Sequence, residues 1–473
     1  MPSVQPIPFS VPPGDPDAPC LRRLRGACDL LQVHKLAPDR YPFLLESAAS
    51  GTPQARYDIL FAFPGETLEL PARGGMTGGM GPTGRADFLA TFDTWWQHEQ
   101  IKEAAESALP PFRGGWFVFI GYELAREIEP TLDLAAAPGS LPVAFATRVP
   151  AAVIHDRVRN EIVLVAEAGG EDLLAELAAD LERARATAPR ADYEPCLEGY
   201  LEEEEPERYL EGVRRVIDYV LAGDVFQVNL SRLWQGRLKP KTRHCELYDR
   251  LRRRNPSPFA GLVRMGNRSI ISSSPERLVK VSGRLVQTRP IAGTRPRGSS
   301  GLTDVALSEE LIAHPKERAE HIMLVDLERN DLSRVCVPGS VKVSERMVIE
   351  SYAQVHHIVS NIEGQLYEDV NPGDVLRAIF PGGTITGCPK VRCMEIIAEL
   401  EQVGRGAYTG SMGYINRDGS MDLNILIRTI VAEGDEISLR AGAGIVADSI
   451  PERELEETQA KARALVMALV TES

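Results

Sequence analysis

The sequence lacks several features that would place it in a special class of protein. No uninterrupted apolar run approaches the ~18 residues of a membrane-spanning helix. The Pro-rich beginning, MPSVQPIPFSVPPGDPDAPC, has no basic region followed by an apolar core, which excludes a typical secretory signal. The seven cysteines include no metal-type CxxC pair, and this pattern suits a reducing compartment. These absences predict a soluble, cytoplasmic protein that does not bind a membrane.

The sequence also lacks an excess of basic residues and any internal repeat. Its net charge of −14 argues against a nucleic-acid partner. An anionic substrate stays compatible, because local Lys, Arg and Mg²⁺ can override the overall sign. No repeat of 20–50 residues is found, which excludes a solenoid.

Strand-like and helix-like segments alternate along the chain. Residues 57–63 have the composition of a strand, and residues 209–222 have the period of an amphipathic helix. The mixture predicts an α+β fold in which large antiparallel sheets form a layered sandwich covered by helices. Residues 187–206 are the best linker candidate, because they contain Pro189 and Pro195 and an acidic run, Glu202–Glu205, that we interpret as a solvated helix start. We therefore predict an N-terminal domain at 1–190 and a second domain at 191–473.

Two pairs of glutamates with the same spacing suggest a metal site. Glu317 and Glu320 open the helical run ERAEHIMLVDLERNDL, and Glu454 and Glu457 lie in a second expected helix, which begins at about residue 452. Residues three apart share a helix face, so the two faces could hold one Mg²⁺. Glu320 and Glu457 are the expected direct ligands, and the other two would act through water. The plain alternative is a pair of solvated acidic helices.

A turn with almost no side chains is predicted just before the second glutamate pair. Gly442, Ala443 and Gly444 would let backbone N–H groups approach an anion there. Lys461 lies four residues after Glu457, on the same expected helix face. The stretch as a whole predicts a site for an anionic small molecule bridged by a metal.

Eight segments, in order over about half of the chain, carry a family resemblance. They are FQVNLS (226–231), SSPERL (273–278), TRPIAGTRPRG (288–298), ERAEHIMLVDLERNDL (317–332), ESYAQVHHIVS (350–360), FPGGTITGCPKVRCMEII (380–397), YTGSMGYINRDGSMDLNILIRT (408–429) and AGAGIVADS (441–449). Together they resemble the chorismate-utilising enzymes, which include anthranilate synthase component I, aminodeoxychorismate synthase component I, and the isochorismate and salicylate synthases. The resemblance implies the fold of anthranilate synthase component I, chorismate as substrate and Mg²⁺ as cofactor.

The resemblance also assigns the residues that would bind chorismate, a dianion. Mg²⁺ would lie on the ring carboxylate, with the backbone of residues 442–444 and Lys461 nearby. Arg428 would grip the second carboxylate bidentately, and Tyr408 would add a hydroxyl. Without the resemblance, Arg428 would be interpreted as a strand-end salt bridge and Tyr408 as a core aromatic. Three further residues would surround the ring: Gly293 and Thr294 as its floor, and Thr384 in a turn that faces it.

Loss of the ring hydroxyl requires a general acid. Glu276 is the best candidate, because burial beside an anionic ligand raises the pKa of a carboxyl. His357 is the second acid/base candidate, near the ring. His356 would point to the opposite face of the same strand, in a structural role.

Two positions bear on the branch of the family. Gln227 stands where members that add water carry a Lys base, so the resemblance favours addition of ammonia. Ala292 stands where many aminodeoxychorismate synthases carry a Lys that forms a covalent ring adduct. Several other segments nevertheless resemble aminodeoxychorismate synthase component I, which makes 4-amino-4-deoxychorismate for p-aminobenzoate and folate. The alternative is anthranilate synthase component I, which releases anthranilate and pyruvate.

Partners and an effector are also implied. No nucleophile-elbow GxCxG with matching His and Glu is found, so ammonia would come from a separate glutamine amidotransferase subunit. LLES, with Glu46 and Ser47, resembles a tryptophan-binding motif, which Pro258, Phe259 and Ala260 would face; a strand end with Ser47 in a turn is equally compatible. A rival of another class is a catalytically silent sensor of aromatic ligands on the same fold.

Overall fold

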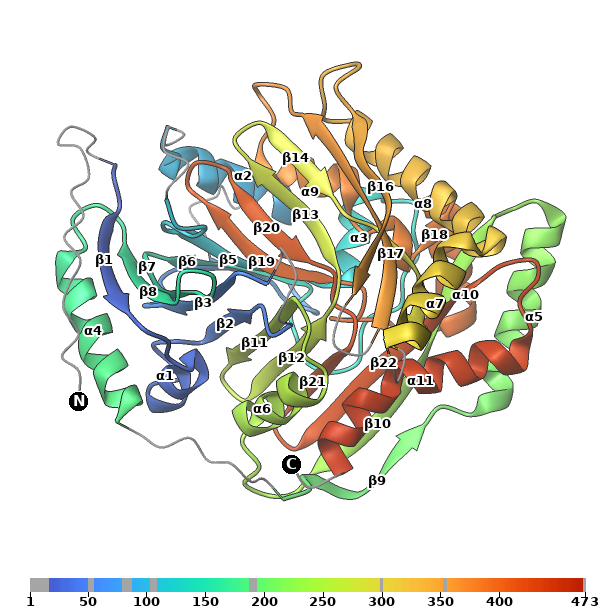
Figure 1. The fold of residues 1–473 in the computed structure, drawn as a ribbon, viewed down its shortest axis with the longest axis horizontal. Helices are drawn as coiled ribbons and strands as arrows, with labels where there is room; N and C mark the ends of the chain where they lie inside the picture. Colours follow the sequence, from blue (N-terminus) through green and yellow to red (C-terminus); the bar gives the residue numbers. More distant parts are fainter. Residues whose placement is uncertain are drawn as a thin grey trace.

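The computed structural model describes most of the chain. The described residues are 17–49, 55–78, 87–102, 109–186, 194–297, 301–351 and 355–470. Over these residues the strands form two large sheets in which all neighbouring strands are antiparallel, and helices cover them (Figure 1). The predicted α+β sandwich is therefore confirmed.

The larger sheet has twelve described strands, and β10 and β22 near one edge carry part of the site. In spatial order the strands are β1 (Cys20–Arg25), β8 (Glu161–Ala166), β7 (Ala151–Asp156), β3 (Tyr57–Ala62), β2 (Phe43–Glu46), β11 (Phe259–Met265), β12 (Arg268–Ser274), β21 (Thr429–Glu433), β22 (Glu436–Ile445), β10 (Gln227–Leu238) and β18 (Gly387–Cys388), and β9 (Leu197–Glu203) also pairs with β10. β9 lies inside the predicted linker, so part of that segment is a strand, and the acidic run ends at Glu205, the N-cap of the helix that begins at Pro206.

The smaller sheet has ten described strands. In spatial order they are β15 (Ile291–Pro296), β17 (Val355–Gln365), β14 (Leu285–Thr288), β13 (Arg277–Ser282), β20 (Met421–Asn424), β19 (Ser411–Asn416), β5 (Gly115–Ile120), β6 (Ala144–Val149) and β4 (Thr67–Leu70), and β16 (Lys342–Ser351) pairs with β17. β15 and β17 bring Gly293 and His357 to the end of the sheet that contributes to the site.

The two sheets pack face to face through aromatic side chains. Phe43 of the larger sheet stacks on Phe117 of the smaller sheet, with ring centroids 4.2 Å apart. Phe61 meets the same ring edge-on at 5.3 Å. Stacked and edge-on pairs are the arrangements that aromatic rings favour, so this layer fixes the position of one sheet on the other.

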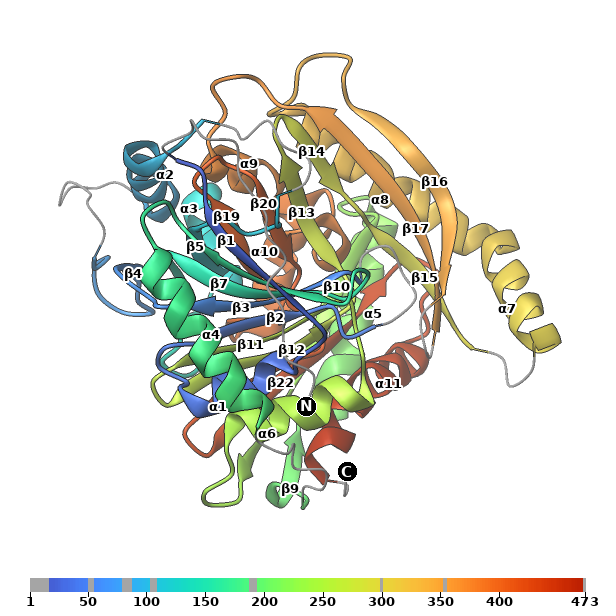
Figure 2. The same ribbon diagram turned by 60° about the vertical axis from the view of Figure 1, so that its left-hand side comes forward.

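Helices lie around the sheets, and two of them carry the predicted glutamate pairs. The helical elements are α1 (Leu30–Leu36), α2 (Phe88–Glu99), η1 (Tyr122–Leu124), α3 (Ala125–Ile128), α4 (Glu171–Arg185), α5 (Pro206–Ala222), α6 (His244–Arg254), α7 (Gly301–Ala313), α8 (Pro315–Ser333), α9 (Pro372–Ile379), η2 (Gly383–Ile385), α10 (Lys390–Glu401) and α11 (Pro451–Val470). α8 and α11 each begin with proline, whose fixed φ suits a first helical position. α11 packs on β22, and α7 lies at the periphery of the molecule (Figure 2).

Both sheets contain strands from either side of residue 190. In the larger sheet β2 pairs with β11, and in the smaller sheet β5 pairs with β19 (Figure 1). The predicted division into 1–190 and 191–473 does not coincide with a division between the sheets, and it stays a prediction. None of the described helices is long and apolar enough to cross a lipid bilayer.

Candidate active site

One cavity gathers nearly all of the predicted site residues. Its volume is about 760 Å³, within the usual range for a small-molecule site. Fourteen predicted residues line it: Gln227, Glu276, Gly293, Glu317, Glu320, His357, Thr384, Tyr408, Arg428, Gly442, Gly444, Glu454, Glu457 and Lys461. We call it the main cavity. They come from both sheets and from α8 and α11, so the fold assembles the cavity from segments far apart in the sequence.

The predicted glycine turn is wrong, because residues 442–444 lie inside strand β22. They pair with residues 229–231 of β10. Gly442 and Gly444 face the main cavity, whereas the side chain of Ala443 is buried in an apolar cluster on the other side of the strand. The alternation of strand side chains explains why Ala443 does not line the cavity. An anion near residues 442–444 would therefore meet a strand and not an open turn.

The two glycines make room for polar side chains. A Cβ atom on Gly442 would lie 2.7 Å from the Tyr408 hydroxyl, and one on Gly444 would lie 2.5 Å from Gln227 Nε2. Both distances are shorter than real Cβ contacts. Gln227 is 2% exposed, and its Oε1 has no hydrogen-bond partner among the described residues. A buried amide without a partner is rare, which marks Gln227 as a group that a ligand would satisfy.

The glutamate pairs of α8 and α11 enter the cavity from two helices. Glu457 forms an ion pair with Lys461 at 2.7 Å, and the same ammonium donates to the Gly442 carbonyl at 2.9 Å. On the α8 side, Glu320 Oε1 would lie 3.6 Å from a Cβ on Gly444, and Glu317 pairs with Arg295 at 3.1 Å. Glu320 is therefore near Gly444, and Glu457 is linked through Lys461 to Gly442. Both glycines belong to β22 and face the cavity.

The donor set fits Mg²⁺ in chemistry. Among the described residues, no group of three or more His, Cys, Asp or Glu side chains lies close enough to hold a metal on its own. Mg²⁺ usually binds through one or two carboxylates and completes its shell with water and ligand oxygens. Glu320 and Glu457, which line the same cavity from two separate helices and bring oxygen ligands only, meet that requirement.

Arg428 follows β20 and precedes β21, and its side chain enters the cavity. Its φ of +51° lies in the left-handed region, which non-glycine residues seldom adopt. Its backbone carbonyl accepts a hydrogen bond from Ser273 N at 3.1 Å, which helps to hold this conformation. Among the described residues its guanidinium forms no ion pair, and burial lowers its pKa. The alternative interpretation as a strand-end salt bridge does not fit this geometry, and the role of Arg428 as a binding group stays a prediction.

Glu276 is a fully buried carboxyl between β12 and β13. Burial raises its pKa to about 7, although contacts with the Thr384 hydroxyl and the Ile291 N–H and the charges of Arg428 and Lys461 act against the rise. The Ile291 N–H donates to Glu276 Oε1 at 3.4 Å. The direction of this shift agrees with the prediction. A carboxyl with this pKa can donate a proton at neutral pH.

The two adjacent histidines point to opposite faces of β17, as predicted. His357 lines the cavity, and burial and the charge of Arg428 lower its pKa to about 4. It is therefore a neutral imidazole at pH 7, which suits a hydrogen-bonding group or a base better than an acid. His356 bonds instead to Ser351 at 2.7 Å and Asp304 at 2.9 Å, in a structural role.

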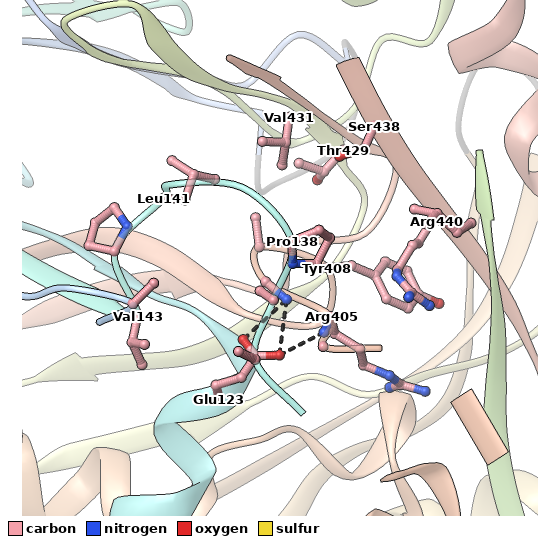
Figure 3. A pocket seen from close by; sticks show the side chains of 18 of the residues that line it. Glu123, Pro138, Leu141, Val143, Arg405, Tyr408, Thr429, Val431, Ser438 and Arg440 are labelled. Carbon is pink, nitrogen blue, oxygen red and sulfur yellow. Dashed lines mark hydrogen bonds between the residues drawn. The ribbon is translucent and has the colours of Figure 1, made fainter. Parts of the chain in front are cut away.

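Tyr408 is held in place by a hydrogen-bonded turn beside a small cavity, which lies next to the main one. The small cavity has a volume of about 60 Å³, and Tyr408 and Arg440 line both cavities. Figure 3 shows Glu123 on its opposite side, where its carboxylate accepts from the N–H groups of Arg405 at 2.6 Å and Gly406 at 3.1 Å. These bonds fix the turn that presents Tyr408, whose pKa burial raises to about 12. Tyr408 is thus a neutral hydroxyl at the cavity wall.

Some site residues lie outside the prediction, and for two predicted residues the structure does not test the assigned role. Asn229 and Arg440 line the main cavity, and Asn229 Oδ1 has no partner among the described residues. The two-residue spacing from Gln227 along a strand could have identified Asn229. The side chain of Ala443 faces away from the cavity, whereas its predicted role as a backbone N–H donor stays a prediction. The backbone of Thr294 lies in β15 opposite His357, but its side chain is outside the described part of the structure.

The predicted effector residues line a second cavity of about 710 Å³. They are Glu46, Ser47, Pro258, Phe259 and Ala260. We call it the second cavity. Glu46 accepts from the Tyr248 hydroxyl at 2.5 Å and pairs with Arg252 at 2.8 Å. Ser47 Oγ donates to the Pro258 carbonyl at 3.2 Å, which ties the two predicted segments together.

The two layered sheets and the mixed-charge cavity indicate an enzyme that acts on a small anionic molecule, and comparisons with known proteins identify its family. The family model described as "chorismate binding enzyme" matches residues 56–467. Anthranilate synthase component 1 of Synechocystis sp. is 42% identical over 474 residues, covering 91% of each chain. Aminodeoxychorismate synthase component 1 of Bacillus subtilis is 38% identical over 452 residues, covering 93% of this chain and 94% of that protein.

A solved structure supports the same relationship. The crystal structure of anthranilate synthase component I from Streptococcus pneumoniae TIGR4 matches with a TM-score of 0.76 and 32% identity, covering 88% of this chain and 93% of that one. The chain belongs to the chorismate-binding enzyme family. Some of these relatives are named anthranilate synthase and others aminodeoxychorismate synthase. Their names therefore agree on the family but not on the product of the reaction.

Proposed function

We propose that the protein is an Mg²⁺-dependent synthase that adds ammonia to chorismate and forms 4-amino-4-deoxychorismate. The observation that carries this proposal is the meeting of Arg428, Glu276 and the paired glutamates in one cavity. A cation site at one end and a guanidinium at the other suit a ligand with two carboxylates. A protonated carboxyl between them suits a hydroxyl that must leave.

In this proposal each end of the substrate has its own anchor. Arg428 binds the enolpyruvyl carboxylate with two parallel N–H donors, and its buried position strengthens the attraction. The Tyr408 hydroxyl donates to the same end. Glu320 and Glu457 would hold Mg²⁺, which supplies positive charge to the ring carboxylate when bound. Lys461 would add charge there, since its ammonium already contacts β22.

Glu276 supplies the proton that lets the ring hydroxyl leave as water. Its carboxyl is still partly protonated near pH 7. His357 is neutral and can accept a hydrogen bond or a proton from the attacking ammonia. Gln227 bonds to the substrate or to ammonia through its unpartnered Oε1, and as an amide it cannot deprotonate water. This last point favours amination over hydration.

The second candidate is anthranilate synthase, and a specific residue favours it. Ala292 is 6% exposed and lines the main cavity, so no amine is available at this position for a covalent ring adduct. One assay separates the candidates: incubation of the purified chain with chorismate, ammonium and Mg²⁺, followed by mass analysis. Our proposal expects an amine that retains the enolpyruvyl group. Fluorescent anthranilate with one pyruvate per turnover would establish the second candidate instead.

The source of ammonia and the effector also belong to the proposal. The names of the relatives, component 1, support a separate amidotransferase subunit that supplies ammonia. The second cavity supports a bound tryptophan, which we expect to detect by calorimetry. Tryptophan binding without any consumption of chorismate would replace the enzyme proposal with a silent sensor of aromatic ligands. Glutamine should support turnover only after an amidotransferase is added.

A further inference from the structure

Asn229 is a buried amide of the main cavity whose backbone is bonded on both sides and whose side-chain oxygen is not. It lies on β10, directly opposite Gly444 of β22, and is 8% exposed. Its N–H donates to the Thr386 carbonyl at 2.9 Å, and its carbonyl accepts from Arg405 Nη2 at 2.7 Å. Its Oδ1, in contrast, has no hydrogen-bond partner among the described residues. A buried amide oxygen of this kind is rare and indicates a group that a ligand would satisfy.

The arginine that holds the backbone of Asn229 is itself firmly held. Arg405 is buried, and it donates to Glu401 from Nε at 3.0 Å and from Nη2 at 2.6 Å. Glu401 also accepts from the hydroxyl of Ser231, two residues beyond Asn229 on β10, at 2.8 Å. A bidentate arginine–carboxylate pair fixes geometry as well as adding energy. The place of Asn229 in the cavity wall is therefore set by the fold before any ligand binds.

A second amide without a partner lies beside Asn229. The carboxamide carbon of Gln227 would lie 3.2 Å from a Cβ atom on Gly444, and over the described part of the chain Gln227 Oε1 accepts no hydrogen bond. Directly opposite residues of antiparallel strands have Cβ positions about 4.5–5.5 Å apart. Since Asn229 is opposite Gly444, the two carboxamides are neighbours. Gly442 leaves room on the other side, because a Cβ there would lie 2.8 Å from Asn229 Oδ1.

Two acceptor oxygens favour a ligand that carries hydrogen-bond donors. A carboxylate has only acceptors and cannot satisfy an amide oxygen. In the proposed function, the groups with N–H or O–H donors are the ring hydroxyl of chorismate and ammonia. Ammonia matches two acceptors better, because it can donate to both oxygens and keep its lone pair free for attack. Both amides are neutral, so they add no negative charge that would stabilise ammonium, which has no lone pair.

We propose that Asn229 and Gln227 together form the binding site for ammonia in the main cavity. The inference rests on the proposed function only as far as amination, since both candidate products require ammonia. Asn229 Oδ1 and Gln227 Oε1 each accept an N–H bond, and the broad terminal torsions of the two amides let the oxygens turn toward the ligand. Glu320, whose Oε1 would lie 3.6 Å from the same Cβ on Gly444, would share its charge with Mg²⁺ and not with ammonia.

The test is the steady-state kinetics of chorismate consumption with Mg²⁺ at one pH, with each substrate varied while the other is saturating. Asn229→Leu keeps the size of the side chain and removes its hydrogen-bonding groups. We expect kcat/KM for ammonia to fall about tenfold, because one hydrogen bond is lost, and kcat/KM for chorismate to change less than about twofold. Asn229→Ala should show the same difference between the two substrates.

Asn361→Leu is the matched control. Asn361 on β17 is also 8% exposed, does not line the main cavity, and donates from Nδ2 to the Ser344 hydroxyl at 2.7 Å. The control therefore removes an amide of equal burial from outside the cavity. The ratio of the two kcat/KM values should stay as in the wild type.

Three results would count against the site. An Asn229→Leu variant with the wild-type kcat/KM for ammonia, which is expected if water occupies the site, would overturn the inference. An equal loss for both substrates, or a loss for chorismate alone, would assign Asn229 to the ring hydroxyl and overturn it as well. If Asn229→Leu does not fold, as judged by its melting curve, Asn229→Ala decides by the same criteria. Absence of chorismate consumption by the wild-type chain would refute the proposed function, and the inference would fall with it.

Discussion

The main cavity and the second cavity have nearly the same volume, but only the main cavity is lined by polar side chains that lack partners among the described residues. In the main cavity, Gln227, Asn229 and Thr384 each have a side-chain atom without a partner among the described residues. In the second cavity, the arginines are paired: Arg56 with Asp156, Arg113 with Asp418 and Arg277 with Asp422. Buried polar groups cost free energy when they are unsatisfied, so the first arrangement is built for a polar ligand and the second is complete without one.

This difference separates a reacting site from an adaptable one. A ligand in the main cavity would form hydrogen bonds with buried polar atoms that have no partner in the part of the chain that the structure describes. These bonds favour a single orientation of the ligand. A ligand in the second cavity has to bind beside existing ion pairs, and this favours weaker, reversible occupation.

The largest effect is expected for Glu276. Its raised pKa of about 7 means that the acid form is present below pH 7 and is lost as the pH rises, so kcat/KM should fall above pH 7. Glu276→Gln should lower kcat by about 10²- to 10⁴-fold and remove this limb. The matched control is Glu46→Gln in the second cavity, which should keep the limb. A Glu276→Gln variant with wild-type kcat would end its assignment as the acid.

Arg428 comes next. Arg428→Lys keeps the charge and loses the planar fork, so kcat/KM for chorismate should fall about 10²- to 10³-fold, a few kcal/mol of binding. Arg277→Lys alters an arginine that is already paired in the second cavity, and turnover should change less than twofold. Steady-state kinetics on both variants measures the contrast. Equal losses would show that unpaired charge does not distinguish the cavities.

The metal should affect one cavity only. Removal of Mg²⁺ with EDTA should stop chorismate consumption, and added Mg²⁺ should restore it. Glu320→Gln should raise the Mg²⁺ concentration for half-maximal rate by about 10- to 100-fold, and Glu317→Gln should raise it less. Calorimetric titration of tryptophan should give the same Kd with and without EDTA. A metal-dependent Kd would show that the two cavities are coupled.

The smallest effect on turnover is expected for Glu46, which should act on stability. Glu46→Gln removes a carboxylate that Arg252 and Tyr248 bind, and this should cost about 1–3 kcal/mol in the free energy of unfolding. Arg252 keeps Asp29 and Asp249, which limits the loss. Urea unfolding gives the value, and kcat in the absence of tryptophan should be unchanged.

The sequence predicted side-chain chemistry better than backbone shape. Helix and strand periods determine which residues share a face. For this reason the sequence alone predicted the shared faces of the ExxE pairs on α8 and α11 and the opposite faces of His356 and His357. The glycines of β22 were misread as a turn, since glycine serves both turns and close approach, and only the positions of Tyr408 and Gln227 distinguish the two.

Other features depend on tertiary contacts that no local pattern reveals. Glu328 looks like an ordinary charged residue of a helix, and only its burial beside Thr288 of β14 shows otherwise. The left-handed conformation of Arg428 is set by the strands around it and not by its own preference. The pairing of strands from the first part of the chain with strands from the last part also cannot be predicted from local sequence, because the composition of a strand does not determine which strand it pairs with.

The interleaving of early and late strands has a practical consequence for anyone who cuts this chain. A fragment that ends near residue 190 would contain β2 and β5 without β11 and β19, and would leave rows of unpaired N–H and C=O groups open to solvent. Neither piece should be recovered as a well-behaved monomer when expressed by itself. When the two fragments are produced together in one cell, they should associate through the same unpaired strand edges. Restored turnover of chorismate would be a sensitive measure of this association.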